Sequence, residues 1–310
     1  MQRTRQGHGP RMPTEQTAVS WPSPAGEPEP RQQPDATGLG GLPPASCLVS
    51  AQRVLAASPA GLATDFDGTI SAIAARPEQA AVLDGVRDSL RRLVPRLAVV
   101  AVVSGRRAED VAQRVGVSGV TYVGNHGLEW HRDGVTEIFD SPPAAQVQLA
   151  LARDALRLLL SQTPGFRLEE KGLAVALHYR RAQRMERARD LALELAGRFA
   201  GDQLTMLEGR RVVELRIASR WNKGTVMQAL ATKHDLRGLV YLGDDVTDAD
   251  AFRALAELRQ AGRTRTLSVA VANPEALIAA LEAADVELDG PPAVGSLLYQ
   301  LSVGFTARTG

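Results

Sequence analysis

Cysteine, excess charge of one sign and long apolar runs are all scarce in this chain of 310 residues. The single cysteine, Cys47, excludes an intrachain disulfide and a zinc cluster built from thiolates, and it fits a reducing, cytoplasmic setting. The formal net charge is +1, with acids and bases interspersed, so we expect neither a nucleic-acid surface nor a polybasic membrane patch. The longest clean aliphatic run, Leu97–Val103, is far too short to span a bilayer. The hydrophobic fraction of 44% is that of a globular protein.

The first fifty residues have few large apolar side chains. They hold half of the 18 prolines, with Gly, Gln, Ser and Thr between them. Such a segment cannot bury enough surface to offset the entropy lost on ordering, so we expect residues 1–50 to form a disordered, proline-rich tail. No apolar stretch follows the basic start, which argues against a secretory signal.

From residue 51 onward, strand-like and helix-like spacings alternate. The expected strands are 61–66, 97–103, 120–124, 239–242 and 266–271. The expected helices are 83–93, 106–115, 223–234, 247–259 and 274–283. This rhythm indicates an α/β fold with a mostly parallel sheet covered on both faces, formed by residues 51–140 and 217–310.

Between these two halves the order of elements changes. Helices are expected at 143–160 and 183–199, and strands at 166–169, 173–179, 204–207 and 211–215. The order α-β-β-α-β-β predicts a separate α+β domain, residues 141–216, inserted into the first.

The segment Asp65-Phe66-Asp67-Gly68-Thr69 places two carboxylates directly after a short apolar run. Ligands bind at the carboxyl ends of strands in open α/β sheets, and alternation along a strand would start Asp65 and Asp67 on one side. A calcium loop is the first alternative, but its twelfth position would be Arg76 where a Glu is needed. A plain surface turn is the second alternative.

Three further pieces have the same form and should meet the first at one edge of the sheet. They are Ser104-Gly105-Arg106, Asn222-Lys223-Gly224 and Gly243–Asp248. A phosphate monoester needs such a set: a hydroxyl from Ser104, the amide of Gly105 at a helix start, and a positive charge from Lys223. Asp65 and Asp244 add the hard oxygen ligands that Mg²⁺ prefers.

Each piece also has an ordinary structural explanation. Ser104-Gly105 can be only a turn, Lys223 a solvated helix residue, and Asp244-Asp245 a cap for the next helix. The ordered combination of all four, each after an apolar run or at a helix start, favours a phosphate site.

These four pieces resemble the haloacid dehalogenase superfamily of phosphotransferases. Its Asp-x-Asp-x-Thr motif is similar to residues 65–69, its Ser/Thr to Ser104, its Lys to Lys223, and its acidic motif to Gly243-Asp244-Asp245 with Asp248. The resemblance covers roughly residues 60–290. It implies a Rossmann-like core, and the inserted segment resembles a C2-type cap domain.

A narrower resemblance is to trehalose-6-phosphate phosphatases. Segments 104–106, 124–129, 169–172, 178–180 and 243–248 resemble the signature segments of that family. Segment 208–216 resembles a cap motif of the family but departs twice, with Arg210 in place of Lys and Ile217 in place of Pro. The first departure keeps the charge and alters its geometry.

By this resemblance Asp65 is the nucleophile, Asp67 the acid and base, and Ser104 and Lys223 hold the phosphoryl oxygens. Mg²⁺ would be held by Asp65, the Asp67 carbonyl and Asp244, with Asp245 and Asp248 behind them. The expected substrate-binding residues are Gly105, Arg106, Asn125, His126, Glu169, Lys171, Arg210 and Glu214. His178 and Arg180 are alternatives that brace the cap.

The predicted activity is Mg²⁺-dependent hydrolysis of trehalose 6-phosphate through an aspartyl-phosphate. Two alternatives remain: a phosphatase of another sugar phosphate, of the glucosylglycerol or mannosylglycerate type, and a non-catalytic sugar-phosphate sensor. A contact of the tail with trehalose-6-phosphate synthase is suggested by composition alone.

Overall fold

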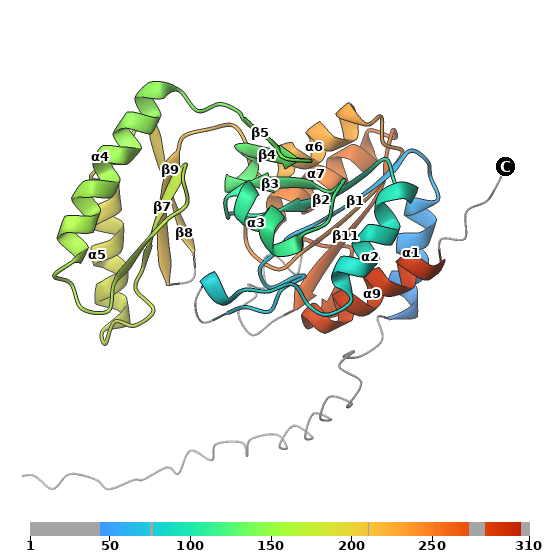
Figure 1. Ribbon diagram of the computed structural model, residues 1–310, viewed down its shortest axis with the longest axis horizontal. Coiled ribbons are helices and arrows are strands. Elements are labelled where there is room, and N and C mark those ends of the chain that lie inside the picture. Colours follow the sequence, from blue (N-terminus) through green and yellow to red (C-terminus); the bar gives the residue numbers. More distant parts are fainter. Residues whose placement is uncertain (1–43, 75–76, 210, 273–282, 305–310) are drawn as a thin grey trace, which may run out of the picture. The chain divides into compact units, whose positions relative to one another are not determined.

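The computed structural model describes residues 44–74, 77–209, 211–272 and 283–304 (Figure 1). Its larger sheet has eight strands in the order β12-β11-β10-β1-β2-β3-β4-β5. The strands are β1 (Ala60–Thr64), β2 (Val99–Val103), β3 (Thr121–Gly124), β4 (Glu129–Arg132), β5 (Val135–Ile138), β10 (Gly238–Gly243), β11 (Arg265–Ala272) and β12 (Val286–Asp289). Those from β12 to β3 are parallel, and β4 and β5 form an antiparallel hairpin at the edge.

Helices cover both faces of this sheet, as the parallel pattern requires. They are α1 (Ala45–Leu55), α2 (Val86–Leu93), α3 (Ala108–Val115), α6 (Lys223–Lys233), α7 (Asp248–Gln260) and α9 (Gly290–Gly304). Alternate residues of one strand enter different cores: Leu62 packs in the cluster that holds residues of α1, α2, α3 and α9, and Ala63 in the cluster of α6 and α7. Burial on both faces explains why these strands read as unbroken apolar runs.

The smaller sheet has four antiparallel strands in the order β6-β7-β9-β8. They are β6 (Arg167–Glu170), β7 (Ala174–His178), β8 (Leu204–Gly209) and β9 (Val212–Ile217). Figure 1 shows α4 (Pro143–Leu160) and α5 (Met185–Gly197) along one face of it. Leu177 and Val213 pack toward these helices, so the register places Glu169, Ala176 and Glu214 side by side on the opposite face.

The predicted α/β class and the mainly parallel sheet are confirmed, and helix 143–160 has the bounds that we expected. The predicted tail was too long by several residues, because Ala45–Leu55 is a helix whose Cys47 and Ala51 are fully buried against the sheet. Residues 1–43 of the tail and most of the predicted helix 274–283 lie outside the described residues. The β4–β5 hairpin, β12 and α9 were not predicted. The division into core and cap at residues 140 and 217 stays a prediction.

No helix in the described part of the chain has the length and apolarity needed to cross a membrane.

Candidate active site

The turn after β1 carries the two carboxylates of the first motif, and they take different partners. The strand ends at Thr64, so Asp65 and Asp67 both lie in the turn rather than on one side of a strand. Asp65 is buried, 5% exposed, and its amide donates to the Leu242 carbonyl of the neighbouring strand β10. The Asp67 side chain is 41% exposed. One carboxylate therefore belongs to the protein interior and the other faces solvent.

Gly68 lets this turn approach the loop after β10. Its φ of +78° lies in the left-handed region, and a Cβ there would come within 2.1 Å of Asp244 Oδ2. The next residue, Thr69, donates from Oγ1 to Asp244 Oδ1 at 3.1 Å. Oxygens of Asp65, Asp244 and Asp248 lie within 4.8 Å of one another. The parallel sheet thus brings together acids that are about 180 residues apart in the sequence.

Asp248 holds the neighbouring residues of this group through four hydrogen bonds. Its Oδ1 accepts from Lys223 Nζ at 2.7 Å and from the Tyr241 hydroxyl at 2.5 Å. Its Oδ2 accepts from the amides of Asp244 and Asp245 at 3.0 and 2.9 Å. A carboxylate with four donors has little capacity left for a metal ion. We therefore regard Asp248 as the support of the site, and Asp65 and Asp244 as the oxygens that can reach a cation.

Lys223 lies at the first position of α6, where Asn222 caps the helix through a capping box with Thr225. Its ammonium group is 2% exposed and donates to Asp65 Oδ1 at 2.9 Å as well as to Asp248. Burial alone would lower the pKa of Lys223, but the charges of Asp248 and Asp65 outweigh it and raise this pKa. The lysine is therefore a permanent positive charge beside Asp65.

The cluster of Asp65, Asp244, Asp248 and Lys223 carries more negative than positive charge. Burial, reinforced by Asp248 and Asp245, raises the pKa of Asp244 to about 7, and burial also raises the pKa of Asp65. Such carboxylates are uncompensated by the protein alone. A hard divalent cation between Asp65 and Asp244 would supply the missing charge, so the donor set fits a metal ion of this kind.

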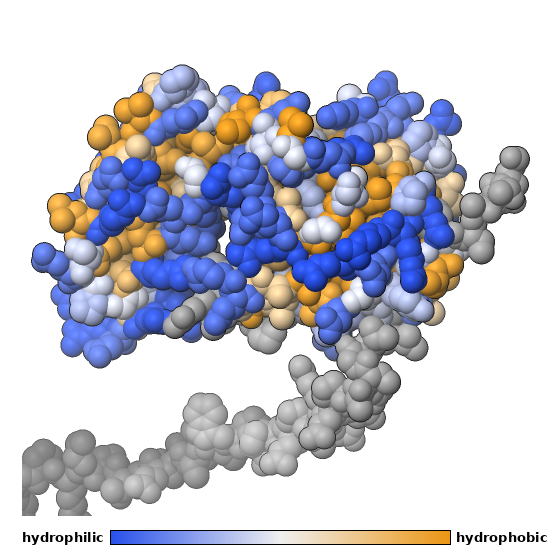
Figure 2. Space-filling view, viewed as in Figure 1, coloured by the Kyte–Doolittle hydropathy of each residue, from blue (hydrophilic) through white to orange (hydrophobic). Residues whose placement is uncertain are grey.

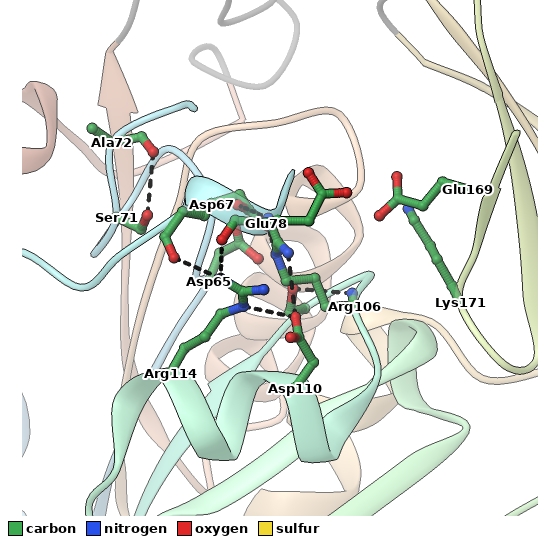
Figure 3. Close-up of polar contacts among 12 residues, drawn as sticks. Asp65, Asp67, Ser71, Ala72, Glu78, Arg106, Asp110, Arg114, Glu169 and Lys171 are labelled. Atoms are coloured by element: carbon green, nitrogen blue, oxygen red, sulfur yellow. Dashed lines mark hydrogen bonds and ion pairs between the residues drawn. The ribbon is translucent and has the colours of Figure 1, made fainter. Parts of the chain in front are cut away.

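Arg106, which we expect to contact substrate, binds the Asp67 carboxylate. Its Nε donates to Asp67 Oδ2 at 2.6 Å and its Nη2 to Oδ1 at 2.8 Å, a bidentate pair. The guanidinium lies over the Phe66 ring and also contacts Asp110, which in turn binds Arg114 at 2.8 Å (Figure 3). The chain of alternating charges holds Asp67 at the mouth of the site.

The Gly105 amide is not at a helix start, which corrects the prediction. Helix α3 begins at Ala108, and the Ala108 amide already donates to Glu129 Oε2 at 2.9 Å. The same carboxylate accepts from Asn125 Nδ2 at 2.7 Å through Oε1. Asn125 therefore contacts β4 through its Nδ2, its part in substrate binding stays a prediction, and the start of α3 is occupied by Glu129. Ser104 is buried beside this turn, where its Oγ accepts from the Arg106 amide at 3.2 Å.

Three of the predicted substrate-binding residues form one group between the two sheets, in which His126 and Glu214 are buried and Lys171 is partly exposed. Lys171 Nζ donates to Glu214 Oε2 at 2.7 Å, and His126 Nε2 lies 3.3 Å from Glu214 Oε1. Burial would raise the pKa of Glu214, but Lys171 and His126 outweigh it and lower this pKa. Glu169, the neighbour of Glu214 on the same sheet face, contacts His178 Nε2 at 2.6 Å. Arg210 lies outside the described residues.

A slot of about 610 Å³ adjoins Arg106 and Lys171. Its lining is polar, with both signs of charge, from α3, from β6 and from the 3₁₀ turn Pro77–Gln79. In Figure 2 hydrophilic side chains gather around the hollow between the elements of the two sheets. Such a lining suits a hydroxyl-rich ligand of small-molecule size.

Sequence reasoning missed Tyr241 and Glu129. Tyr241 reads as one more apolar residue of a buried strand, and Glu129 lies in the signature segment 124–129 without a role assigned to it. Only the long-range contacts to Asp248 and Ala108 reveal their parts in the site.

Comparisons with known proteins agree with this geometry. The sequence model of the trehalose-phosphatase family matches residues 63–283. Trehalose-phosphate phosphatases of Mycolicibacterium paratuberculosis and Mycobacterium avium are 41% and 40% identical over 197 residues, which cover 62% of this chain and 50% of each relative. The chain thus spans about half the length of the curated relatives it matches.

Solved structures show the same fold. The C-terminal domain of Candida albicans trehalose-6-phosphate phosphatase superposes with a TM-score of 0.69 at 21% identity, over 85% of this chain and 98% of that one. An Aspergillus fumigatus trehalose-6-phosphate phosphatase gives 0.57 at 24% identity, over 85% and 100%. Together with the match over residues 63–283, the shared fold and the acidic site at the ends of β1 and β10 lead to one conclusion: this chain belongs to the trehalose-phosphatase family.

Proposed function

We propose that this protein hydrolyses trehalose 6-phosphate to trehalose and inorganic phosphate. The observation that carries the proposal is the buried group of Asp65, Asp244 and Lys223 beside a polar slot. The choice of trehalose 6-phosphate as substrate follows from membership of the trehalose-phosphatase family, and the slot has the volume and polarity for a sugar phosphate.

In the proposed reaction Asp65 is the nucleophile. One carboxylate oxygen attacks phosphorus, the bond from phosphorus to the sugar oxygen breaks, and an aspartyl-phosphate forms. The contact from Lys223 to Asp65 Oδ1 orients the carboxylate and places positive charge next to the phosphoryl group. Ser104, at the end of β2, would donate to a phosphoryl oxygen.

Asp67 acts in both halves of this reaction. Protonated, it gives its proton to the departing sugar oxygen, and the resulting carboxylate then removes a proton from the water that attacks the aspartyl-phosphate. The bidentate contact with Arg106 fixes the orientation of the Asp67 carboxylate at the mouth of the site. Arg106 is thus proposed to position Asp67.

Mg²⁺ is the cofactor that we propose, held by Asp65, the carbonyl of Asp67 and Asp244. Bound there, it would neutralise phosphoryl charge during transfer. Lys171, Glu214 and Glu169 would bind sugar hydroxyls from the cap, residues 141–216, while residues 51–140 and 217–310 form the core. Arg210 and His126 would assist at its edge, and the activity would be cytoplasmic.

The direct test is phosphate release from trehalose 6-phosphate with Mg²⁺ and with EDTA. We expect release only with the metal, and much slower release from glucose 6-phosphate. Rapid release from another sugar phosphate, but not from this one, would move the protein to a different substrate within the same chemistry. No release from any sugar phosphate would favour a sensor.

A contact with trehalose-6-phosphate synthase is a separate proposal that depends on the proline-rich residues 1–43. Co-purification of the synthase with the full chain, compared with a chain that begins at residue 44, tests it.

A further inference from the structure

The slot next to the active site has two defined ends. Its floor is α3 and its wall is β6, which run in opposite directions. At the near end Gly172, just after β6, approaches Arg107, whose Nε would be 3.2 Å from a Cβ on that glycine. At the far end Arg167, the first residue of β6, binds Glu78 Oε1 at 3.1 Å. Arg114, in the last turn of α3, donates to the Glu78 carbonyl at 3.2 Å.

The near end of the slot adjoins the reacting carboxylates. Arg106 binds Asp67 there, and Lys171 lies across from it on the wall (Figure 3). With a rise of 1.5 Å per residue, the floor of the slot extends roughly 9 Å along α3 from Arg107 to Gln113. A sugar ring whose phosphate reaches Asp65 fills only the near part of such a slot. The remaining length leads toward Gln113, Arg167 and Glu78.

The polar groups at the two ends differ in whether their hydrogen-bonding capacity is used. At the near end and in the middle, Arg106, Asp110 and Lys171 are held by charged partners on their own side of the slot. At the far end the Gln113 side chain is exposed and has no hydrogen-bond partner among the described residues. The pair of Arg167 and Glu78 is 43% and 65% exposed, so its attraction is weak and its donors can be shared.

We propose that Gln113, Arg167 and Glu78 form a subsite for the sugar ring that does not carry the phosphate. An amide, a guanidinium and a carboxylate present the donors and acceptors that a ring of neutral hydroxyls needs. The subsite makes the enzyme selective for disaccharide phosphates over monosaccharide phosphates. This inference rests on the proposed function and adds to it three residues that lie on the floor and end of the slot.

The test compares two substrates in the full-length enzyme with Mg²⁺. Values of kcat and KM are measured for trehalose 6-phosphate and glucose 6-phosphate in the wild type, Gln113→Ala and Arg167→Gln. We expect the KM for the disaccharide phosphate to rise about three- to tenfold in each variant, the effect of one lost hydrogen bond, with kcat within about twofold. The kcat/KM for glucose 6-phosphate should not change.

Matched controls are Gln260→Ala and Arg253→Gln, which alter exposed side chains on α7, away from the slot. They should leave both substrates unaffected. A second readout is inhibition by the products: the slot variants should weaken inhibition by free trehalose and leave inhibition by inorganic phosphate unchanged.

Several outcomes would overturn the subsite. Equal losses on both substrates would mean that these residues act on the phosphate site or on folding, and no loss on either would mean a solvated surface. A wild type that hydrolyses both substrates equally well would refute the subsite while the phosphatase chemistry stands. A wild type that releases phosphate from no sugar phosphate would refute the proposed function and the subsite with it.

Discussion

The carboxylate cluster at the ends of β1 and β10 and the slot between α3 and β6 are both rich in charge, yet they differ in burial. In the cluster, Asp65, Asp248 and Lys223 are nearly inaccessible, and Lys223 donates a hydrogen bond to each of the two carboxylates. At the far end of the slot, Arg167 and Glu78 are largely exposed. Buried charges are strongly coupled to folding and exposed ones are not. The proposed catalytic cluster and the proposed sugar subsite therefore differ in how strongly their charges are coupled to folding.

The largest effect is expected when the proposed nucleophile is removed from the buried cluster. Asp65→Asn should lower kcat by at least about a thousandfold, because the amide cannot form the acyl-phosphate. Binding of trehalose 6-phosphate, measured by calorimetry, should remain. Asp88→Asn, which alters an exposed acid on α2 outside the cluster, is the control and should retain turnover. Residual turnover near the wild-type rate in Asp65→Asn would assign the nucleophile elsewhere.

A second change tests how strongly the cluster is coupled to folding. Lys223→Met leaves Asp65 and Asp248 buried without their cation, and we expect a loss of about 3–5 kcal/mol in the free energy of unfolding. Urea titration measures it, with Lys233→Met at the exposed end of the same helix as the control. Equal, small effects of both substitutions would remove the contrast between buried and exposed charge.

The third prediction concerns pH and metal. The pKa of Asp244 is raised from an ordinary 3.8 to about 7, so the folded protein keeps a proton that the unfolded chain has released. The free energy of unfolding of the metal-free protein should therefore fall as pH rises from about 4 to 7, by at most roughly 4 kcal/mol.

Urea titrations in EDTA at several pH values measure this slope. Addition of Mg²⁺ should restore stability above pH 6, and Asp244→Asn should flatten the slope. A metal-free protein that becomes more stable across this window would contradict the assignment of excess negative charge to the cluster.

The smallest effect is expected in the wall of the slot. His178→Ala removes the partner of Glu169, so the carboxylate loses its fixed position, and we expect the KM for trehalose 6-phosphate to rise a fewfold with kcat retained. His234→Ala, a partly exposed histidine distant from the slot, is the control. Steady-state kinetics distinguish this result from a fall in kcat, which would place His178 in the chemical step.

The fold and the centre of the site follow from local patterns in the sequence. Parallel strands end at one edge, so apolar runs followed by Asp65, Ser104 or Asp244 predict a shared site wherever the strands are adjacent. The contacts around that centre depend on tertiary packing. Arg106 turns to Asp67 because the turn after β1 presents a carboxylate there, and Glu129 occupies the start of α3 because a hairpin at the sheet edge brings it there.

Two further features were not predicted from the sequence because they also depend on tertiary packing. The composition of residues 1–50 does not predict helix α1, because Cys47 and Ala51 find their core partners only in the folded protein. Tyr241 is predicted as a core residue because it is fully buried in a strand. Its hydroxyl, which donates to Asp248, makes it part of the site.

The four donors on Asp248 have a consequence for tolerance to change. The Asp248 side chain links Lys223 on α6 with the backbone of the loop after β10. Its length therefore sets the distance between the Lys223 ammonium group and Asp244. A glutamate in place of Asp248 would keep the negative charge, but its longer side chain would change the distance between Lys223 and Asp244. Substitutions in the slot leave this spacing unchanged, so under the proposed function the sugar preference could change while the carboxylates and Lys223 keep their positions.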